Sequence, residues 1–482
     1  MKTPLIAPLV LCLLAACAVN PATGERQLAL VSEAQEVEIG RNAAKQVQQT
    51  MAMVGDAALA AYVERAGQRL ARDSERPELP WSFQVVDDPA PNAFALPGGF
   101  IYVTRGMLTL MDSEAELVSV LGHEVGHVTA RHSVAQMSRA QLAQLGLGLG
   151  GALFPELQAF GDVAGLGLNL LLLKYGRDAE READELGFRY ARQEGYELSE
   201  MADVFASLAR LGDLDEGSAL PSWLSTHPAP EERVQAVEAR LANLDQHSLD
   251  ATVGRSEYLD RIDGLAYGEN PRNGFFRAGT FYHPDLAFRF DVPEDWQTRN
   301  LARSVIGISP ERDAAIQFTL AGETSPPQAL EQFLSQQGLQ PGSSGTDTIN
   351  GVSAAIGNFQ AQTQQGVVTG YAAFFAHGGS TYQLVTYAPA QRFSDWDTPF
   401  QQMIRSFAPL TDERILNVEP PVLEIVSLER AMTLAEFDRR HPSGIPIERL
   451  AILNQVAGAE TRLAQGTLVK RVAGDASLST TE

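Results

Sequence analysis

The segment that most constrains this chain is His123-Glu124-Val125-Gly126-His127, in which two histidines stand four residues apart and a glutamate follows the first. In a helix, residues four apart lie on one face, so both imidazoles can bind one zinc ion. Ser113 and Glu116 have the spacing of a capping box at the start of such a helix, and apolar residues follow them. We therefore predict a helix that presents His123 and His127 as metal ligands and Glu124 as a general base. The alternative is a structural helix whose histidines bind no metal.

A catalytic zinc site needs a third protein ligand, and an acidic segment at residues 177–190 can supply it. This segment reads as a helix that ends by Gly195. Glu182 and Glu185 fall on a face that carries arginines, which predicts that both carboxylates are exposed to solvent.

The other face of the same predicted helix carries Glu180, Ala183, Asp184 and Gly187. Its small residues would let the helix approach the histidine helix closely, so we predict Glu180 as the third zinc ligand. We predict that Asp184 accepts the spare ring N–H of a ligating histidine and so fixes its tautomer. A charged surface helix without metal is the alternative.

Composition limits the partners and the metal chemistry. The 482 residues include 37 Lys and Arg against 60 Asp and Glu, a formal charge of -23, which disfavours nucleic acid as a partner. Both cysteines, Cys12 and Cys17, lie near the start, which leaves no thiol pair for a structural disulfide or a zinc–cysteine site. Any metal is therefore held by histidines and carboxylates.

The first residues predict export. A basic start at Lys2 precedes a short apolar stretch that is typical of a secretory signal. It ends in Leu14-Ala15-Ala16-Cys17, which resembles the lipobox of bacterial lipoproteins. We predict a signal peptide at 1–17, lipidation of Cys17, and a location in the bacterial periplasm on the inner leaflet of the outer membrane. An ordinary signal peptide is the alternative.

The length allows two to four domains, and the pattern of apolar and polar residues changes twice along the chain. We predict a mainly helical domain at 18–245 with a β-hairpin at 93–104, and a linker at 246–275. An α+β domain with an antiparallel sheet is expected at 276–412, a small βααβ tail at 413–472, and a frayed terminus at 473–482. The apolar, glycine-rich stretch at 142–173 reads either as a lid or membrane-facing loop or as a buried helix pair.

These motifs together resemble the zinc metallopeptidase family of the CAAX prenyl protease, HtpX and BepA type, over roughly residues 20–245. The resemblance rests on the histidine motif and Glu180 to Asp184, and on four further segments of the chain. These are Asn20-Pro21-Ala22-Thr23-Gly24, Leu30-Val31-Ser32, Asn92-Ala93-Phe94-Ala95-Leu96-Pro97-Gly98-Gly99, and Thr226-His227-Pro228 with Arg233. It implies a zincin-like fold, one zinc ion on His123, His127 and Glu180, and Glu124 as the base.

The resemblance also implies that His227 and Arg233 face the active site. They would either steady the oxyanion or act as a plug that occupies the open zinc position. By residue type alone, His227 before a proline reads as a loop histidine. A substrate chain would bind in an extended conformation along an edge strand at Asn92, Ala93, Phe94 and Ala95. This strand would recognise only the backbone of the substrate. The chain lacks the transmembrane helices of the CAAX prenyl protease and HtpX, so prenylated substrates are disfavoured.

We therefore expect a zinc endopeptidase of the bacterial envelope that hydrolyses unfolded or misassembled proteins. The alternatives are a chaperone or assembly factor with a latched metal site, and a wall-binding scaffold with a vestigial protease. Residues 276–412 resemble a PsbP-like domain, and the tail is similar to a LysM module without its usual Gly-Asp-Thr opening. Expected partners are polypeptides, the membrane through the lipid, and either the outer-membrane assembly machinery or peptidoglycan.

Overall fold

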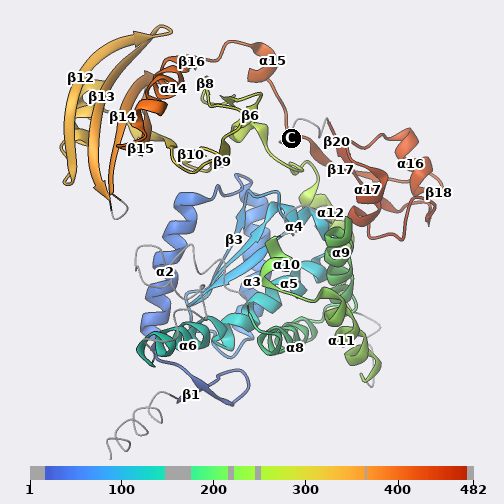
Figure 1. Ribbon diagram of the computed structural model, residues 1–482. Coiled ribbons are helices and arrows are strands. Elements are labelled where there is room, and N and C mark those ends of the chain that lie inside the picture. Colours follow the sequence, from blue (N-terminus) through green and yellow to red (C-terminus); the bar gives the residue numbers. More distant parts are fainter. Residues whose placement is uncertain (1–16, 147–174, 215–221, 245–250, 364–365, 475–482) are drawn as a thin grey trace, which may run out of the picture. The chain divides into compact units, whose positions relative to one another are not determined.

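The computed structural model describes residues 17–146, 175–214, 222–244, 251–363 and 366–474 (Figure 1). They divide into two compact units. The helical unit comprises the residues up to 48 together with 52–268 and 421–474, and the sheet unit comprises 49–51 and 269–420. The predicted signal peptide before Cys17, most of the stretch at 142–173 and the end of the terminus lie outside the described residues.

The helical unit contains a three-stranded sheet in the order β3-β5-β4, formed by β3 (Ser82–Val86), β4 (Ala93–Leu96) and β5 (Phe100–Thr104). Strands β4 and β5 are the predicted hairpin, and Gly98 and Gly99 adopt positive φ at its turn. Strand β3 was not predicted and pairs parallel with β5. Because β5 lies between the other two, β4 is an edge strand.

Helices pack around this sheet, and α3 and α5 contact its strands directly. The helices from the first part of the chain are α2 (Glu33–Thr50), α3 (Ala57–Arg72), α4 (Arg105–Leu110), α5 (Glu114–Thr129), α6 (His132–Gly146), α8 (Arg177–Gln193), α9 (Glu200–Leu214), α10 (Ser222–Thr226), α11 (Pro230–Ala242) and α12 (Arg255–Ile262). Helix α5 is the predicted histidine helix and α8 is the predicted acidic helix.

Helices α5 and α8 lie side by side and touch through small residues (Figure 1). A Cβ added at Gly187 would stand 2.8 Å from the backbone nitrogen of His123, and one added at Gly126 would stand 3.0 Å from the carbonyl oxygen of Ala183. No larger side chain fits at these positions without moving a backbone. The close approach brings the first turn of α8 to the two histidines.

The end of the chain folds as a βααβ module within the helical unit. Its elements are β17 (Val422–Ser427), β18 (Met432–Thr433), α16 (Leu434–Arg440), α17 (Ile447–Leu453), β19 (Arg462–Leu463) and β20 (Leu468–Ala473). Strand β17 pairs with β20, and Thr433 and Glu436 form a capping box at the start of α16. Buried residues of the module, such as Leu423 and Phe437, belong to the same core as Val118 of α5.

This placement corrects the separate tail domain that the sequence predicts at 413–472. The side chain of Lys470 is fully buried, and its Nζ donates to the carbonyl oxygens of Thr109, Leu110 and Met111 at 3.0, 3.2 and 3.0 Å. Its Nζ also lies 2.7 Å from Asp112 Oδ1. These groups directly precede α5, so the module holds the segment that leads into the histidine helix.

The sheet unit covers 269–420, somewhat more than the predicted 276–412. A seven-stranded antiparallel sheet has the order β12-β13-β14-β15-β11-β10-β9, and a four-stranded sheet has the order β16-β8-β7-β6. The strands are β6 (Phe275–Arg277), β7 (Thr280–His283), β8 (Phe288–Asp291), β9 (Gln297–Leu301), β10 (Ser304–Ile308), β11 (Ala315–Gly322), β12 (Leu339–Ile349), β13 (Val352–Thr363), β14 (Gly366–His377), β15 (Ser380–Pro389) and β16 (Ala408–Pro409). The helices are the 3-10 helix η4 (Pro271–Asn273), α13 (Pro326–Leu334), α14 (Phe393–Ser406) and α15 (Glu413–Leu416).

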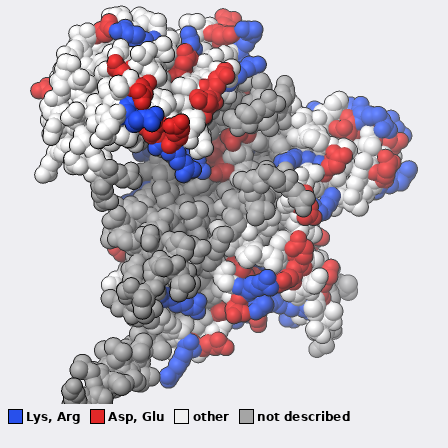
Figure 2. Space-filling view, viewed as in Figure 1, with Lys and Arg blue, Asp and Glu red and all other residues white. Residues whose placement is uncertain are grey.

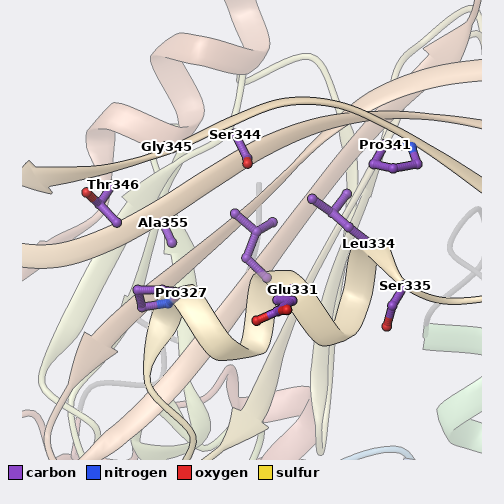
Figure 3. Close-up of a pocket in the computed structure, with 10 residues that line it drawn as sticks. Pro327, Glu331, Leu334, Ser335, Pro341, Ser344, Gly345, Thr346 and Ala355 are labelled. Atoms are coloured by element: carbon purple, nitrogen blue, oxygen red, sulfur yellow. The ribbon is translucent and has the colours of Figure 1, made fainter.

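A groove of about 480 Å³ lies between α13 and the strands β12 and β13 of the sheet unit. In Figure 3, the helix that carries Glu331 and Leu334 lies beneath the strand that carries Ser344 and Gly345. Among the described residues that line the groove, Glu331 alone carries an ionisable side chain. The groove therefore offers no group of catalytic or metal-binding side chains.

Acidic and basic side chains are interspersed over the described part of the face shown in Figure 2. Within the described ranges, no helix has both the length and the apolar character needed to cross a membrane.

Candidate metal centre

Helix α5 holds its functional side chains at the centre of the helical unit. Ser113 caps the helix by accepting a hydrogen bond from the backbone N–H of Glu116 at 3.1 Å. Every residue of α5 is buried, including His123, Glu124 and His127. Because α5 is buried on all sides, packing rather than solvent-exposed contacts fixes the direction of these three side chains.

Four donor atoms converge beside α5, one each from His123, His127, Glu180 and His227, and all lie within 4.8 Å of one another. The Nε2 atoms of His123 and His127 are 3.0 Å apart. Glu180 reaches them from α8, with carboxylate oxygens 3.6 Å from His123 Nε2 and 3.5 Å from His127 Nε2. The structure therefore brings together the three predicted metal ligands and one further histidine.

This cluster has the dimensions of a tetrahedral metal site. Zinc–nitrogen bonds of about 2.0–2.1 Å place tetrahedral donors roughly 3.4 Å from one another. Burial, which is the largest influence, lowers the pKa of His127 well below its usual value and keeps this imidazole neutral, as a metal ligand requires. Three imidazoles and one carboxylate form a donor set that suits Zn²⁺.

His227 takes the place of a fourth donor. Its Nδ1 lies 3.1 Å from both carboxylate oxygens of Glu180 and 3.3 Å from His123 Nε2. The indole of Trp223 stacks on its ring, with centroids 4.9 Å apart. Burial lowers the pKa of His227, but the carboxylates of Glu180 and Glu124 outweigh burial and raise this pKa overall. With His227 in this position, the donor set has four protein groups rather than three.

The carboxylate of Glu124 differs from the other buried charged groups of this site in its hydrogen bonding. Glu124 is 1% exposed, and neither of its carboxylate oxygens has a hydrogen-bond partner among the described residues. Glu124 Oε1 lies 3.6 Å from His227 Nε2. Burial raises the pKa of Glu124, and the neighbouring histidines oppose that shift only in part. Since buried carboxylates are normally paired, this one marks a place for a water molecule or a substrate group.

Residues 57–241, which contain all four donors and Glu124, match the family model described as peptidase family M48. These residues form an M48 peptidase domain. The beta-barrel assembly-enhancing protease of Yersinia pestis is 29% identical over 251 residues, which cover 50% of this chain and 50% of that protein. The mitochondrial metalloendopeptidase OMA1 of Schizosaccharomyces pombe is 34% identical over 185 residues, or 37% of this chain and 51% of that protein. The chain thus spans about half the length of these curated relatives.

Among solved structures, the cyanobacterial PsbP of Synechocystis aligns with 28% of this chain and 94% of its own length, at 12% identity and a TM-score of 0.24. So low a score assigns no fold to the sheet unit. The M48 family is zinc-dependent, and the four convergent donors of the M48 domain can hold one such ion.

Arg233 and Asp184 support the M48 site from behind. Asp184 Oδ1 lies 2.9 Å from His123 Nδ1, and Arg233 donates to both oxygens of Asp184 at 2.9 and 2.6 Å. Burial would raise the pKa of Asp184, but Arg233 and His123 outweigh burial and hold this pKa well below its usual range. The Arg233 guanidinium also lies 3.9 Å from the ring centre of Phe205. Arg233 is therefore tied to Asp184, and its guanidinium also lies 3.5 Å from Glu180 Oε2 and 3.1 Å from His123 Nδ1.

The predicted substrate strand lies at the edge of the M48 sheet. Ala93, Phe94 and Ala95 belong to β4, and Asn92 directly precedes it and accepts the backbone N–H of Thr104 at 2.8 Å. The side chains of Ala93, Phe94 and Ala95 are buried, and β4 packs against α5. The strand is thus close to the histidine helix, while its role in binding a substrate stays a prediction.

Sequence reasoning missed two aromatic or basic neighbours of His127 in the M48 domain. The ring of Tyr175 stacks on His127, with centroids 4.0 Å apart, and His132 Nδ1 lies 2.7 Å from His127 Nδ1. The sequence signal for His132 is its position, five residues after the second motif histidine and at the start of the next helix. Tyr175 stands just before α8, and no local pattern distinguishes it.

Proposed function

We propose that the protein is a zinc-dependent endopeptidase of the bacterial envelope, with His123, His127 and Glu180 as zinc ligands and Glu124 as the general base. The observation that carries the proposal is the buried carboxylate of Glu124, which accepts no hydrogen bond from the described residues and lies beside four convergent donors. A structural metal site has no need of such a group, because a buried carboxylate without hydrogen bonds is costly. Membership of residues 57–241 in the M48 family supports the same activity.

The proposed mechanism assigns each group a separate task. A bound Zn²⁺ supplies a Lewis acid that polarises a carbonyl oxygen and lowers the pKa of water. Glu124 takes a proton from water and passes it to the leaving amine, and burial moves its pKa upward, toward the range that suits such transfers. Arg233 orients Asp184, and Asp184 orients His123. The substrate backbone binds along β4, which favours unfolded chains over a fixed sequence motif.

Metal removal tests this proposal directly. We expect one zinc ion per purified chain, digestion of unfolded casein, loss of that activity on treatment with a chelator, and recovery on adding zinc. His123→Ala is expected to lose the metal, whereas His283→Ala, in the sheet unit, serves as the matched control and keeps it. Zinc-free protein that digests casein at an undiminished rate would contradict the proposal.

We propose that His227 acts as a latch on the zinc rather than as a group that steadies the oxyanion. Its Nδ1 stands at ligand distances from the other donors, and four protein ligands leave no open position for water. His227→Ala is therefore expected to raise the rate of casein digestion several-fold at unchanged zinc content. A lower rate in this variant would favour the oxyanion role instead.

The proposed substrates are unfolded or misassembled envelope proteins. The beta-barrel assembly-enhancing protease of Yersinia pestis supports this choice by its name, and it supports the outer-membrane assembly machinery as a partner. Both relatives described above are peptidases, which favours proteolysis over the chaperone alternative. Proteomic comparison of cells with and without the protein tests the substrate class, and unchanged levels of outer-membrane proteins would contradict it.

For the location, we propose a lipid anchor on Cys17 at the inner leaflet of the outer membrane, and a LysM-like role for residues 421–474 in binding peptidoglycan. The lipobox-like residues support the first, and the βααβ order supports the second. Mass spectrometry of the mature N-terminus tests lipidation. Retention of the full chain on purified peptidoglycan tests wall binding. A PsbP-like fold of the sheet unit stays a proposal from the sequence.

A further inference from the structure

A second histidine stands directly behind the candidate ligand His127. His132 begins α6, is 7% exposed, and places its Nδ1 2.7 Å from His127 Nδ1. The two rings meet edge to face, with centroids 4.9 Å apart. Two ring nitrogens at this distance require that one carries a proton and the other accepts it.

The surroundings of His127 decide which nitrogen is the donor. His127 Nε2 faces the other metal donors, 3.0 Å from His123 Nε2 and 3.5 Å from Glu180 Oε1, so its lone pair belongs to the metal. The proton of a neutral His127 is then on Nδ1 and is donated to the bare Nδ1 of His132. His132 in turn carries its proton on Nε2.

The proton on His132 Nε2 faces a carboxylate from α8. Glu182 Oε2 lies 3.3 Å from His132 Nε2, and Glu182 Oε1 accepts a hydrogen bond from the side-chain amide of Asn20 at 2.6 Å. Asn20 is buried and forms a turn in which its own Oδ1 accepts the backbone N–H of Ala22. This turn lies between β1 (Cys17–Val19) and β2 (Arg26–Leu28) and outside the residues that match the M48 model.

We propose that His132, Glu182 and Asn20 are positioning residues that fix the tautomer and orientation of His127 and thereby set the metal affinity of the site. The inference rests on the proposed metal site and extends it to the start of the chain. Helix α8 then has three tasks: Glu180 binds the metal, Asp184 orients His123 directly, and Glu182 orients His127 through His132. The turn at residues 20–25, three residues after Cys17, becomes a support of the metal centre.

The test measures zinc affinity of the full chain by competition with a chromophoric chelator, together with the melting temperature of the metal-free protein. His132→Leu removes the hydrogen bond to His127 and the ion-pair contact with Glu182, and is expected to weaken zinc binding by about 10–100-fold, the usual effect of losing a partner behind a ligand. His132→Gln retains one acceptor and one donor and is expected to restore most of the affinity. Glu182→Gln is expected to cause an intermediate loss, and Asn20→Ala the smallest.

Glu185→Gln is the matched control, because it makes the same chemical change on the exposed side of α8 and should leave zinc affinity unchanged. Wild-type affinity in both His132→Leu and Glu182→Gln would overturn the inference, as would equal losses in His132→Leu and His132→Gln. If His132→Leu does not fold, Glu182→Gln decides alone. Wild-type protein that binds no zinc would instead contradict the proposed function.

Discussion

Replacing Glu124 with Gln is expected to abolish casein digestion while one zinc ion per chain stays bound. The glutamine side chain has nearly the same shape but cannot accept a proton from water, and general acid–base catalysis typically contributes about 10²–10⁴-fold to a rate. The ligands His123, His127 and Glu180 are untouched. The measurement pairs the initial rate of casein digestion with zinc analysis of the same sample.

For the same substitution we expect no loss of stability, and this second expectation distinguishes loss of the base from loss of folding. Glu124 is buried with neither oxygen hydrogen-bonded among the described residues, so replacing the charge with a neutral amide lowers the cost of burying it. We expect the melting temperature to rise or stay level. An inactive variant with a lower melting temperature would point to damage to the fold, and a variant with wild-type activity would exclude Glu124 as the base.

Replacing Lys470 with Met is expected to destabilise the whole helical unit by roughly 3–5 kcal/mol, the usual cost of removing one partner of a buried ion pair. The change removes one of the two cations that pair with the buried Asp112, the other being Arg255, and it leaves three carbonyl oxygens without their donor. Because these groups lead into α5, casein digestion should fall with the free energy of unfolding. Urea denaturation measures that energy, and the rate is measured on the same preparation.

Arg471→Met is the matched control for Lys470→Met, since it removes a neighbouring cation of the same strand. Arg471 pairs with the half-buried Glu424 near the surface, and a pair of this kind contributes only about 0–1 kcal/mol. Equal urea midpoints for wild type and Lys470→Met would show that residues 421–474 are not an integral part of the helical unit.

Regular spacing made helices α5 and α8 predictable. The histidines four residues apart, and the face of small residues at Ala183 and Gly187, depend only on helical geometry, and the structure places Glu180 beside both histidines. The same reasoning was wrong about Glu182, which shares a face with exposed residues but is half-buried against His132 and Asn20. Those partners are 50 and 162 residues away in sequence, so no local pattern reveals them.

Long-range pairing also explains the missed strand and the misplaced tail. Strand β3 is short and becomes a strand by pairing parallel with β5, from which it is separated in sequence by β4. The proline pair at 420–421 suggested an independent tail, whereas one buried lysine joins this module to carbonyl groups about 360 residues earlier in the chain.

The sheet unit interrupts the helical unit between residues 268 and 421, and this order has a consequence for biosynthesis. The ribosome incorporates His123 and His127 long before it incorporates Lys470, which supports the start of their helix. The nascent chain therefore has all of the proposed chemical groups while its fold still lacks a supporting module. The proposed metal centre therefore gains the support of residue 470 only after the sheet unit has been translated, which separates the synthesis of its ligands from the completion of its fold.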